Sequence, residues 1–310
     1  MQLSCHLQNF PFDRVANGSV ATIGSFDGLH LGHQALLRAV FREASERNLP
    51  SVVMSFEPTP KEFFLADKPP ARLMRFREKF EALDTSGVDI FFCPRFNEAM
   101  RNIAADTFIR QILVHALNVR HLVIGDDFRF AQDREGHLDM LRRAGAAIGF
   151  TVEQVSSVIE GGERVSSSSI REALWQGDLE RASRLLGYQY RMSGKVIVGD
   201  RVGRELGYPT ANVNLNRKQS AVTGIFAVRV SGKDWGPLNA VASIGTRPTF
   251  GSSKPLLEVH IFDFDKDIYG EYIHVDFVAR LRSEEKFDDV SALVEQMHRD
   301  SAQARDILAA

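Results

Sequence analysis

Two histidines three residues apart, His30 and His33, flank a glycine in the segment His-Leu-Gly-His. An apolar run, Val20–Ile23, precedes them and an amphipathic pattern follows from Leu36, which predicts a strand, a glycine-rich turn and a helix start. A helix N-terminus presents free amide groups and the positive end of its dipole, which favour phosphate. Two imidazoles there could stabilise charge that develops on an α-phosphate; the alternative is a pair that caps the helix and packs the turn. Further candidates for binding a nucleotide, in the preceding Gly-Ser-Phe-Asp-Gly run, are Gly24, Phe26 and Asp27.

A second helix start with anion-binding character follows Val165, in the run Val-Ser-Ser-Ser-Ser-Ile-Arg. Ser167 and Ser168 can cap free amide groups there, and Arg171 lies within the first turn. The alternative is a plain serine cap beside a surface arginine. Because two helix N-termini can meet at the carboxyl edge of one parallel sheet, the two motifs together predict a phosphate site.

The chain contains no Gly-x-x-x-x-Gly-Lys-Ser/Thr motif, which excludes a P-loop. It has instead a glycine-rich run in which Gly203 and Gly207 would let backbone amides approach a phosphate. Thr210 and Asn212 follow, two residues apart on an extended segment, so their side chains point the same way. Two neutral oxygens on one face suit Mg²⁺, which takes its other ligands from water and phosphate. The alternative is a β-bulge with both side chains on the surface.

Glu258 is a carboxylate on a predicted strand. Alternation places Leu257, Val259 and Ile261 on one face and Glu258 with His260 on the other. The spacing alone does not distinguish a catalytic carboxylate from an ordinary exposed one.

The elements that must position these residues change in type near residue 187. Before it, short apolar runs alternate with helical patterns, which predicts right-handed βαβ units and a parallel sheet. The predicted strands are 20–23, 51–56, 88–93, 119–124 and 150–155, and the predicted helices are 75–85, 106–117, 137–147 and 170–186.

After residue 187, six predicted strands follow one another, at 195–198, 208–215, 225–230, 240–244, 256–262 and 272–281. Strands without intervening helices predict an antiparallel sheet or barrel. The tail 288–308 returns to helical spacing, with Val290, Leu293, Val294 and Met297 as the face that could cover the barrel. We therefore predict two domains, residues 1–186 and 187–310.

Composition limits the partners. The 310 residues include 38 Lys and Arg against 40 Asp and Glu, a balance that argues against bulk binding to nucleic acid or a membrane surface. The two cysteines form no disulfide framework, which suits a reducing compartment. The N-terminus lacks a secretory signal, and no apolar run approaches the roughly 18 residues of a membrane span. We expect a cytoplasmic enzyme of small-molecule substrates, and the oligomeric state stays open.

Several motifs resemble one family. The His-x-Gly-His turn, the Ser-Ser-Ser-x-Ile-Arg helix start and Gly-Asp-Asp-Phe-Arg-Phe at 125–130 resemble the adenylyltransferase half of bacterial bifunctional riboflavin kinase/FAD synthetases. The segments 203–212, 244–250 and 257–260 resemble the kinase half. The motifs occur in order and cover essentially the whole chain.

The resemblance implies that the first half has a Rossmann-like nucleotidyltransferase fold and transfers AMP from ATP to FMN, giving FAD and pyrophosphate. Such a reaction needs aligned phosphates and stabilised charge, without a covalent intermediate. By residue match, His30 and His33 would act on the α-phosphate. The leaving phosphates would be held by Ser167, Ser168 and Arg171.

For the second half, the resemblance implies ATP-dependent phosphorylation of riboflavin in a β-barrel, with Mg²⁺ on Thr210 and Asn212. Glu258 would be the general base that takes the proton of the attacking ribityl hydroxyl. Arg247 and Arg282 would belong to a flavin-side loop and flap.

Aromatic residues of the first half are candidates for binding the flavin. Phe128 and Phe130 alternate with an arginine and could form one wall for the isoalloxazine ring, although such residues are more often core. Phe56 is a further candidate. Asp127 could orient a ribose, a phosphate or Mg²⁺, or simply cap the next turn.

Three positions depart from the family pattern. Ser25 stands where asparagine is more usual, and Ser168 where threonine is, and both keep a polar side chain. Ala131 replaces a glycine, which is acceptable only if the backbone there needs no positive φ.

Two other functions fit part of the sequence: a cytidylyltransferase-like enzyme with an inert barrel, and a regulator that senses FMN without converting it. An inert barrel would not need Thr210, Asn212 and Glu258. The near-neutral charge and the lack of a nucleic-acid-binding motif count against the regulator.

Overall fold

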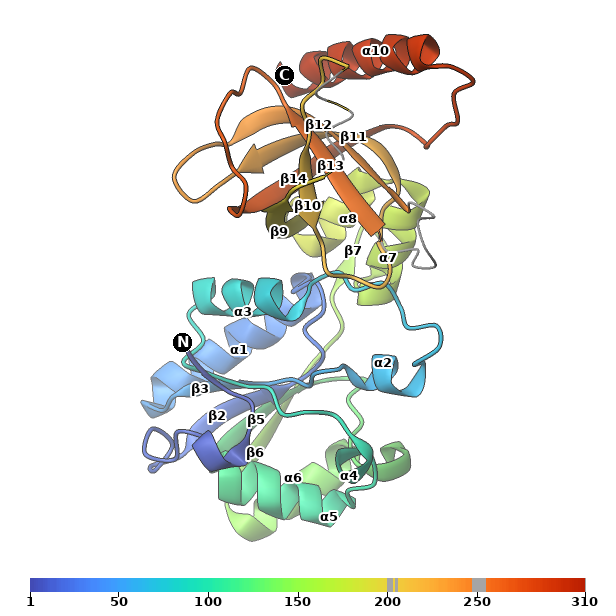
Figure 1. Ribbon diagram of the computed structural model, residues 1–310. Helices are drawn as coiled ribbons and strands as arrows, with labels where there is room; N and C mark the ends of the chain where they lie inside the picture. Colours follow the sequence, from blue (N-terminus) through green and yellow to red (C-terminus); the bar gives the residue numbers. More distant parts are fainter. Residues whose placement is uncertain (200–202, 204–205, 247–254, 310) are drawn as a thin grey trace. The chain divides into compact units, whose positions relative to one another are not determined.

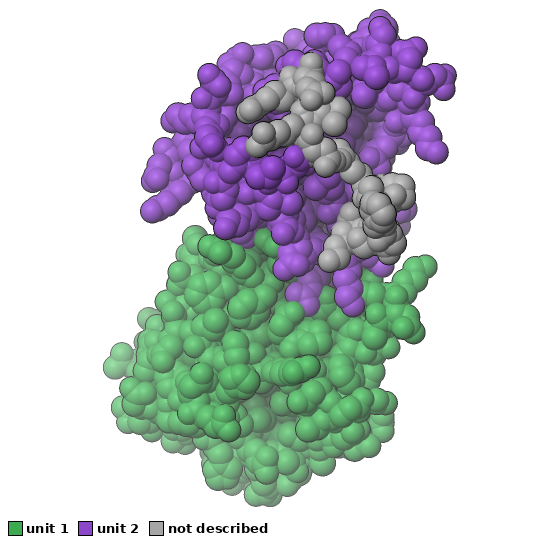
Figure 2. Space-filling model, viewed as in Figure 1, with its two compact units in different colours: residues 1–70, 74–166 green, residues 71–73, 167–310 purple. Residues whose placement is uncertain are grey.

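The computed structural model describes residues 1–310 except 200–202, 204–205, 247–254 and 310. The chain forms two compact units (Figure 2). The first unit contains residues 1–70 and 74–166, and the second contains residues 71–73 and 167–310.

The first unit is built on a six-stranded parallel sheet with strand order β1-β4-β3-β2-β5-β6 (Figure 1). Its strands are β1 Gln2–Ser4, β2 Ser19–Ile23, β3 Ser51–Met54, β4 Ile90–Phe92, β5 Val119–Gly125 and β6 Thr151–Val155. Its helices are α1 Leu31–Arg47, α2 Pro60–Phe64, α3 Phe76–Thr85, α4 Glu98–Arg101, α5 Ala105–Thr107 with a π-helical continuation Phe108–Ala116, and α6 Leu138–Ile148. Short 3-10 segments lie at Leu7–Asn9 and Gln132–Arg134, and β7 Ile159–Glu160 pairs with β8 Glu163–Arg164.

Helices cover both faces of this sheet. On β3, Val53 packs with residues of α1 and α3, whereas Val52 and Met54 pack with the π-helical segment and α6. Fully buried strands with apolar residues on both faces explain why the runs are continuously apolar. All five predicted strands and the predicted helices 75–85, 106–117 and 137–147 are confirmed, and the predicted helical stretch 170–186 is divided into two helices at 177–178. Strand β1 was not predicted, because three residues carry too little pattern.

The second unit contains a closed antiparallel barrel in the order β10-β13-β12-β11-β14-β9 (Figure 1). Its strands are β9 Arg191–Ile197, β10 Ala211–Asn214, β11 Gly224–Ser231, β12 Leu238–Thr246, β13 Pro255–Ile261 and β14 Tyr272–Arg282. The barrel, which sequence alternation predicted as an antiparallel sheet or barrel, is confirmed.

The terminal helix, α10 Val290–Ala309, packs on the barrel through its last turns. Ala304 and Leu308 form a buried cluster with Ala227 and Phe262. The predicted apolar face lies further toward the N-terminus of the helix, and its first member, Val290, is 59% exposed. Among the described residues, none of the helices combines the length and apolar character that a membrane crossing requires.

Two helices that sequence pattern assigned to the first domain, α7 Ser167–Gln176 and α8 Leu179–Leu186, group with the second unit. The bend between them lies against β14, where Arg280 donates to the carbonyl of Gln176 at 3.4 Å. The predicted domain boundary at 186/187, between an adenylyltransferase domain and a kinase domain, stays a prediction.

Candidate active sites

His30 and His33 lie where β2 gives way to α1, at the carboxyl edge of the sheet of the first unit. His30 is the N-cap of α1, and its Nδ1 accepts a hydrogen bond from the His33 amide at 3.4 Å. The two rings stack with centroids 3.7 Å apart. The predicted capping role is therefore real and uses Nδ1, so His30 would have to act on a phosphate through Nε2.

His33 carries an unsatisfied nitrogen. Its Nδ1 is inaccessible to solvent and has no hydrogen-bond partner among the described residues. Burial, and next the neighbouring charges of His30 and Lys79, hold the pKa of His33 well below its usual value. A buried polar atom without a partner is costly in a folded protein. A neutral imidazole that is partly exposed at a helix N-terminus is suited to meet a ligand.

The loop before the histidines is strained and closely packed. Phe26 is fully buried at φ 47° and stacks near His33, with ring centroids 4.9 Å apart. Asp27 is buried, and its carboxylate accepts a hydrogen bond from the Met74 amide at 2.8 Å. A side chain at Gly32 would come within 3.2 Å of the His30 ring, which explains the glycine of the motif. Non-glycine residues at positive φ cost about 1–3 kcal/mol and concentrate at functional sites.

The flavin candidates of the first unit lie in two places. Phe56 packs edge-to-face on Phe96, with centroids 5.5 Å apart. Phe128 and Phe130 stack at 5.8 Å, and Phe130 is buried in the core whereas Phe128 is partly exposed. Asp127 is exposed and pairs with Arg164 at 3.0 Å. Their role toward a flavin stays a prediction.

Ser167 begins α7, as the serine run predicted. Arg171 donates from Nε to the carbonyl of Ala71 at 2.6 Å and from Nη1 to that of Ser167 at 3.0 Å. The guanidinium thus lies along the first turn of the helix, which also contains Ser168. These residues belong to the second unit and the histidines to the first.

In the barrel, register brings the predicted kinase residues together. Asn212 is directly opposite Glu258, and Glu258 is directly opposite Ser243. Ser243 is opposite Ile225, which is opposite Arg282. Directly opposite side chains share a face, with Cβ atoms about 4.5–5.5 Å apart. Their sequence neighbours Leu257, Val213 and Ile244 are completely buried. We call Arg282, Ile225, Ser243, Glu258 and Asn212 the outer-face row.

The glycine-rich lead-in lies against one end of this row. A side chain at Gly199 would overlap the amide group of Asn212, which is itself buried. One at Gly203 would come within 2.4 Å of the Tyr208 carbonyl and 3.3 Å of Thr210 Oγ1. Gly207 has φ 82°, a conformation that favours glycine. Thr210 also lines a cavity of about 840 Å³ together with the loop residues Phe264–Tyr269.

A second cavity, of about 470 Å³, lies at the other end of the row. Arg282 lines it and forms a two-pronged ion pair with buried Asp300 of α10, with Nη2 to Oδ2 at 2.8 Å. Burial, with Glu258 adding to it and Arg282 opposing it, raises the pKa of Glu284 in the cavity wall. Its other lining residues include Ile225, Ser243, Phe287, Val290 and Leu293. Arg247 lies outside the described residues.

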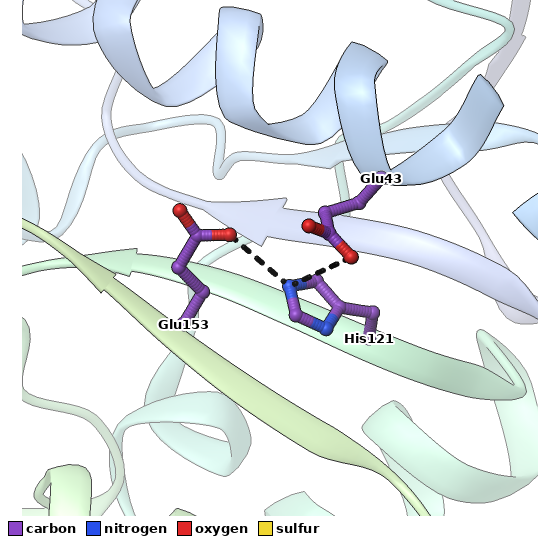
Figure 3. Close-up of side chains that lie close together, drawn as sticks. All are labelled: Glu43, His121 and Glu153. Atoms are coloured by element: carbon purple, nitrogen blue, oxygen red, sulfur yellow. Dashed lines mark hydrogen bonds and ion pairs between the residues drawn. The ribbon is translucent and has the colours of Figure 1, made fainter. Parts of the chain in front are cut away.

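A third polar cluster joins Glu43 of α1, His121 of β5 and Glu153 of β6 (Figure 3). His121 Nε2 lies 3.7 Å from Glu43 Oε2 and 3.4 Å from Glu153 Oε2. Arg42 donates to Glu153 Oε2 at 2.6 Å and Arg47 to Glu43 Oε2 at 2.9 Å. Burial raises the pKa of Glu43, but hydrogen bonds from both arginines outweigh it and the pKa is lowered. Because two arginines already balance the two carboxylates, we interpret the cluster as a structural network and not as a metal site.

Lys79 of α3, which is only 2% exposed and affects His33 electrostatically, was not predicted from the sequence. A signal was present: Lys79 falls on the apolar face of its helix, between Phe76 and Phe80 at helical spacing. Ser243 of β12, which lines the second cavity, was not predicted either.

Comparison with known proteins gives matches to both halves of the chain. Residues 13–169 match a family model described as FAD synthetase, and residues 186–308 match one described as riboflavin kinase. Proteins described as bifunctional riboflavin kinase/FMN adenylyltransferase are similar over nearly their full length. The one from Escherichia coli is 45% identical over 289 residues, covering 93% of this chain and 92% of the relative. The one from Haemophilus influenzae is 43% identical over 305 residues, covering 98% of each.

A solved structure is similar over the whole chain as well. It is described as a macrolide-efflux protein from Streptococcus pneumoniae, with a TM-score of 0.82, 30% identity and 98% coverage of both chains. The likeness extends through both compact units and supports the two-part fold.

Proposed function

Because the chain belongs to the bifunctional riboflavin kinase/FMN adenylyltransferase family, we propose that the cluster around His33 and the outer-face row are its two active sites. The protein phosphorylates riboflavin with ATP to give FMN, and it transfers AMP from ATP to FMN to give FAD and pyrophosphate. An inert barrel and a non-converting flavin sensor are therefore set aside.

For the kinase, the register of the outer-face row is the observation that carries the proposal. Glu258 stands between Asn212 on one side and the cavity walled by Ser243 and Arg282 on the other. A flavin in that cavity and the phosphates of ATP near Thr210 and Asn212 would meet at the Glu258 carboxylate. Glu258 accepts the proton of the ribityl hydroxyl as its oxygen attacks the γ-phosphorus, and the bond to the bridging oxygen breaks to release ADP.

Thr210 and Asn212 fit a hard cation. Both present neutral oxygens, and glycines at 199 and 203 leave the space that a Cβ would otherwise fill beside them. Mg²⁺ prefers oxygen ligands and keeps several from water and phosphate, so two protein ligands are sufficient. When bound, the ion would neutralise phosphate charge; Thr210 and Asn212 would hold it beside the row.

For adenylyl transfer, the place of the partly exposed His33 ring in the first turn of α1, stacked on the N-cap His30, carries the proposal. His33 and Nε2 of His30 would donate to the α-phosphate oxygens as the FMN phosphate attacks and pyrophosphate leaves. Gly24, Phe26 and Asp27 shape the loop that holds both rings. Family resemblance adds Ser167, Ser168 and Arg171 for the leaving phosphates. The same resemblance proposes Phe56, Asp127, Phe128 and Phe130 as the residues that bind the flavin in the adenylyltransferase half. It proposes Arg247 as a flavin-binding residue of the kinase half.

A metal titration tests the kinase assignment. We expect Asn212→Ala to need at least about tenfold more Mg²⁺ for half-maximal FMN formation, since one ligand is lost. Asn214→Ala, on the same strand but exposed, is the matched control and should behave like the parent. Riboflavin, FMN and FAD would be separated by chromatography. An unchanged Mg²⁺ requirement for Asn212→Ala would remove Asn212 from the site.

We also infer a cytoplasmic location, consistent with both cysteines being free.

A further inference from the structure

Lys79 is a buried lysine next to the adenylyl-transfer site. It is 2% exposed on α3, a helix whose buried face also contains Leu83. Removing an ammonium group from water is expensive unless hydrogen bonds and favourable charges compensate. A methionine would fill similar space at lower cost, so the charge itself has to be explained.

The contacts of Lys79 join two loops at the carboxyl edge of the sheet. Its Nζ donates to the Ser25 carbonyl at 2.6 Å and to Ser55 Oγ at 3.3 Å. Ser55 Oγ in turn donates to the same Ser25 carbonyl at 3.2 Å. Ser25 belongs to the loop after β2 that leads to His30, and Ser55 follows β3. Lys79 therefore fixes the backbone that places the histidine turn.

Its charge also acts on His33. Two titratable groups influence the His33 imidazole, namely His30 in the same turn and Lys79 from α3. Both oppose protonation of His33, in addition to burial. The Asp27 carboxylate in the same loop accepts from the Met74 amide just before α3. The neighbouring segment thus holds the loop at two points, through Met74 and through Lys79.

We propose that Lys79 is a positioning residue of the adenylyl-transfer site: its ammonium group, which donates to the Ser25 carbonyl and to Ser55, fixes the loop that places the His33 ring. This inference rests on the proposed role of His33 at the α-phosphate. A neutral ring in a fixed place offers a preorganised donor or acceptor without having to lose a proton first. Lys79 itself is too buried to touch the nucleotide.

The test compares three variants of the full chain in FAD formation from supplied FMN and ATP. Lys79→Met should lower kcat about 10- to 100-fold, because small misplacements of catalytic groups cost rates of this order. Lys79→Arg, which keeps the charge, should recover part of that loss. Arg77→Met removes an exposed charge from the same helix and should match the parent. Riboflavin phosphorylation should stay at the parent rate in all three.

The titration of His33 separates a positioning role from a merely structural one. In spectra of isotope-labelled histidine, assigned by the signal lost in His33→Gln, Lys79→Met should move the His33 titration to higher pH. Lys79→Arg should leave it in place. Parent-level FAD formation in Lys79→Met, or an unmoved His33 titration, would overturn the proposal.

If Lys79→Met fails to fold, Ser55→Ala provides a second test of the same hydrogen bonds. It deletes one acceptor of Nζ and leaves the charge, so we expect a loss of a few-fold in FAD formation with the His33 titration unchanged. Parent-level activity in Ser55→Ala, together with unfolding of Lys79→Met, would assign Lys79 to stability alone. Failure of the underlying His33 proposal is distinguishable, since it would appear as full FAD formation in His33→Ala.

Discussion

The imidazole of His33 combines burial, a lowered pKa and an unsatisfied ring nitrogen. We expect His33→Ala to reduce FAD formation by about 100-fold or more, the usual cost of losing one preorganised donor. FMN formation should remain, because Thr210, Asn212 and Glu258 lie in the other unit. The measurement is chromatography of products from riboflavin and from FMN. His115→Ala, which removes an exposed histidine, is the control. Equal loss of both activities in a folded protein would contradict the two-site model.

Glu258 gives the converse prediction. Glu258→Gln keeps the shape of the side chain but cannot accept a proton, so riboflavin phosphorylation should fall by about 100-fold or more. Adenylylation of supplied FMN should survive. Glu295→Gln on α10, with a carboxylate side chain 67% exposed, is the matched control. Phosphorylation at the parent rate would make Glu258 an ordinary strand residue, and the base would have to be sought elsewhere, first at Glu284.

Ala131 departs from its expected backbone. Alanine fits this position without strain only if the backbone has a negative φ. The structure does not meet this condition, because Ala131 has φ 66° and ψ −175°. This region is nearly restricted to glycine and costs about 1–3 kcal/mol for other residues. Ala131→Gly should therefore raise the free energy of unfolding by about 1 kcal/mol. Thermal unfolding measures the change.

The control for Ala131→Gly is the same substitution within a helix. Ala302 lies exposed in the interior of α10, where glycine should destabilise by about 0.5–1 kcal/mol. Changes of opposite sign in the free energy of unfolding for the two glycine substitutions would identify backbone conformation as the cause. A decrease in stability for Ala131→Gly would mean that contacts of the methyl group outweigh the strain.

At the scale of elements, periodicity predicted most of the fold because each pattern is local. The continuous apolar run at 52–54 and the strict alternation at 255–261 both depend on neighbours in sequence alone. Elements that are too short to show a period, such as β1 and the β7–β8 hairpin, could not be predicted. The contact face of α10 was predicted only in part: Leu293, Val294 and Met297 are half-buried, but the buried contacts with the barrel lie in the last turns, at Ala304 and Leu308.

The candidate site residues also differ in whether local sequence could predict them. His30 and His33 could be found because the motif, its turn and its helix are contiguous. Pairing of Asn212 with Glu258 depends on barrel register between segments more than forty residues apart, which no local pattern specifies. Lys79 depends on packing of α3 against two loops.

One element links both ends of the kinase site. In α10, His298 shares a hydrogen bond with Tyr208, two residues before Thr210. Asp300 of the same helix holds Arg282 beside the second cavity. The terminal helix therefore braces both the segment that we propose to hold Mg²⁺ and the proposed flavin-side wall, although it supplies none of the proposed phosphoryl-transfer residues.

At the scale of the molecule, the two activities should be separable. Residues 187–310 contain the whole barrel, α10 and the three residues assigned to phosphoryl transfer, in the size range of an independent domain. We expect this fragment to fold and to convert riboflavin to FMN without making FAD. The prediction is measured by circular dichroism and a riboflavin–ATP assay.

The compact units indicate what that fragment would lack. Segment 71–73 belongs to the second unit: buried Arg217 donates to the Arg72 carbonyl, and Tyr190 donates to that of Leu73 at 3.4 Å. Fragment 187–310 lacks these acceptors, so we expect it to be less stable than the same barrel in the full chain. Fragment 187–310 also loses α7 and α8, where Gln176 accepts from Arg280.

A longer fragment, residues 167–310, restores the α7–α8 contacts but not segment 71–73. It should therefore melt above fragment 187–310 and below the full chain, while both fragments phosphorylate riboflavin. If neither fragment is active although both are folded, the first unit contributes to the kinase site and the proposed division at 186/187 fails. If only the longer fragment folds, the boundary of the autonomous kinase lies at the start of α7. The helix that begins with Ser167 then stabilises the kinase half, while in our proposal Ser167 itself serves adenylyl transfer.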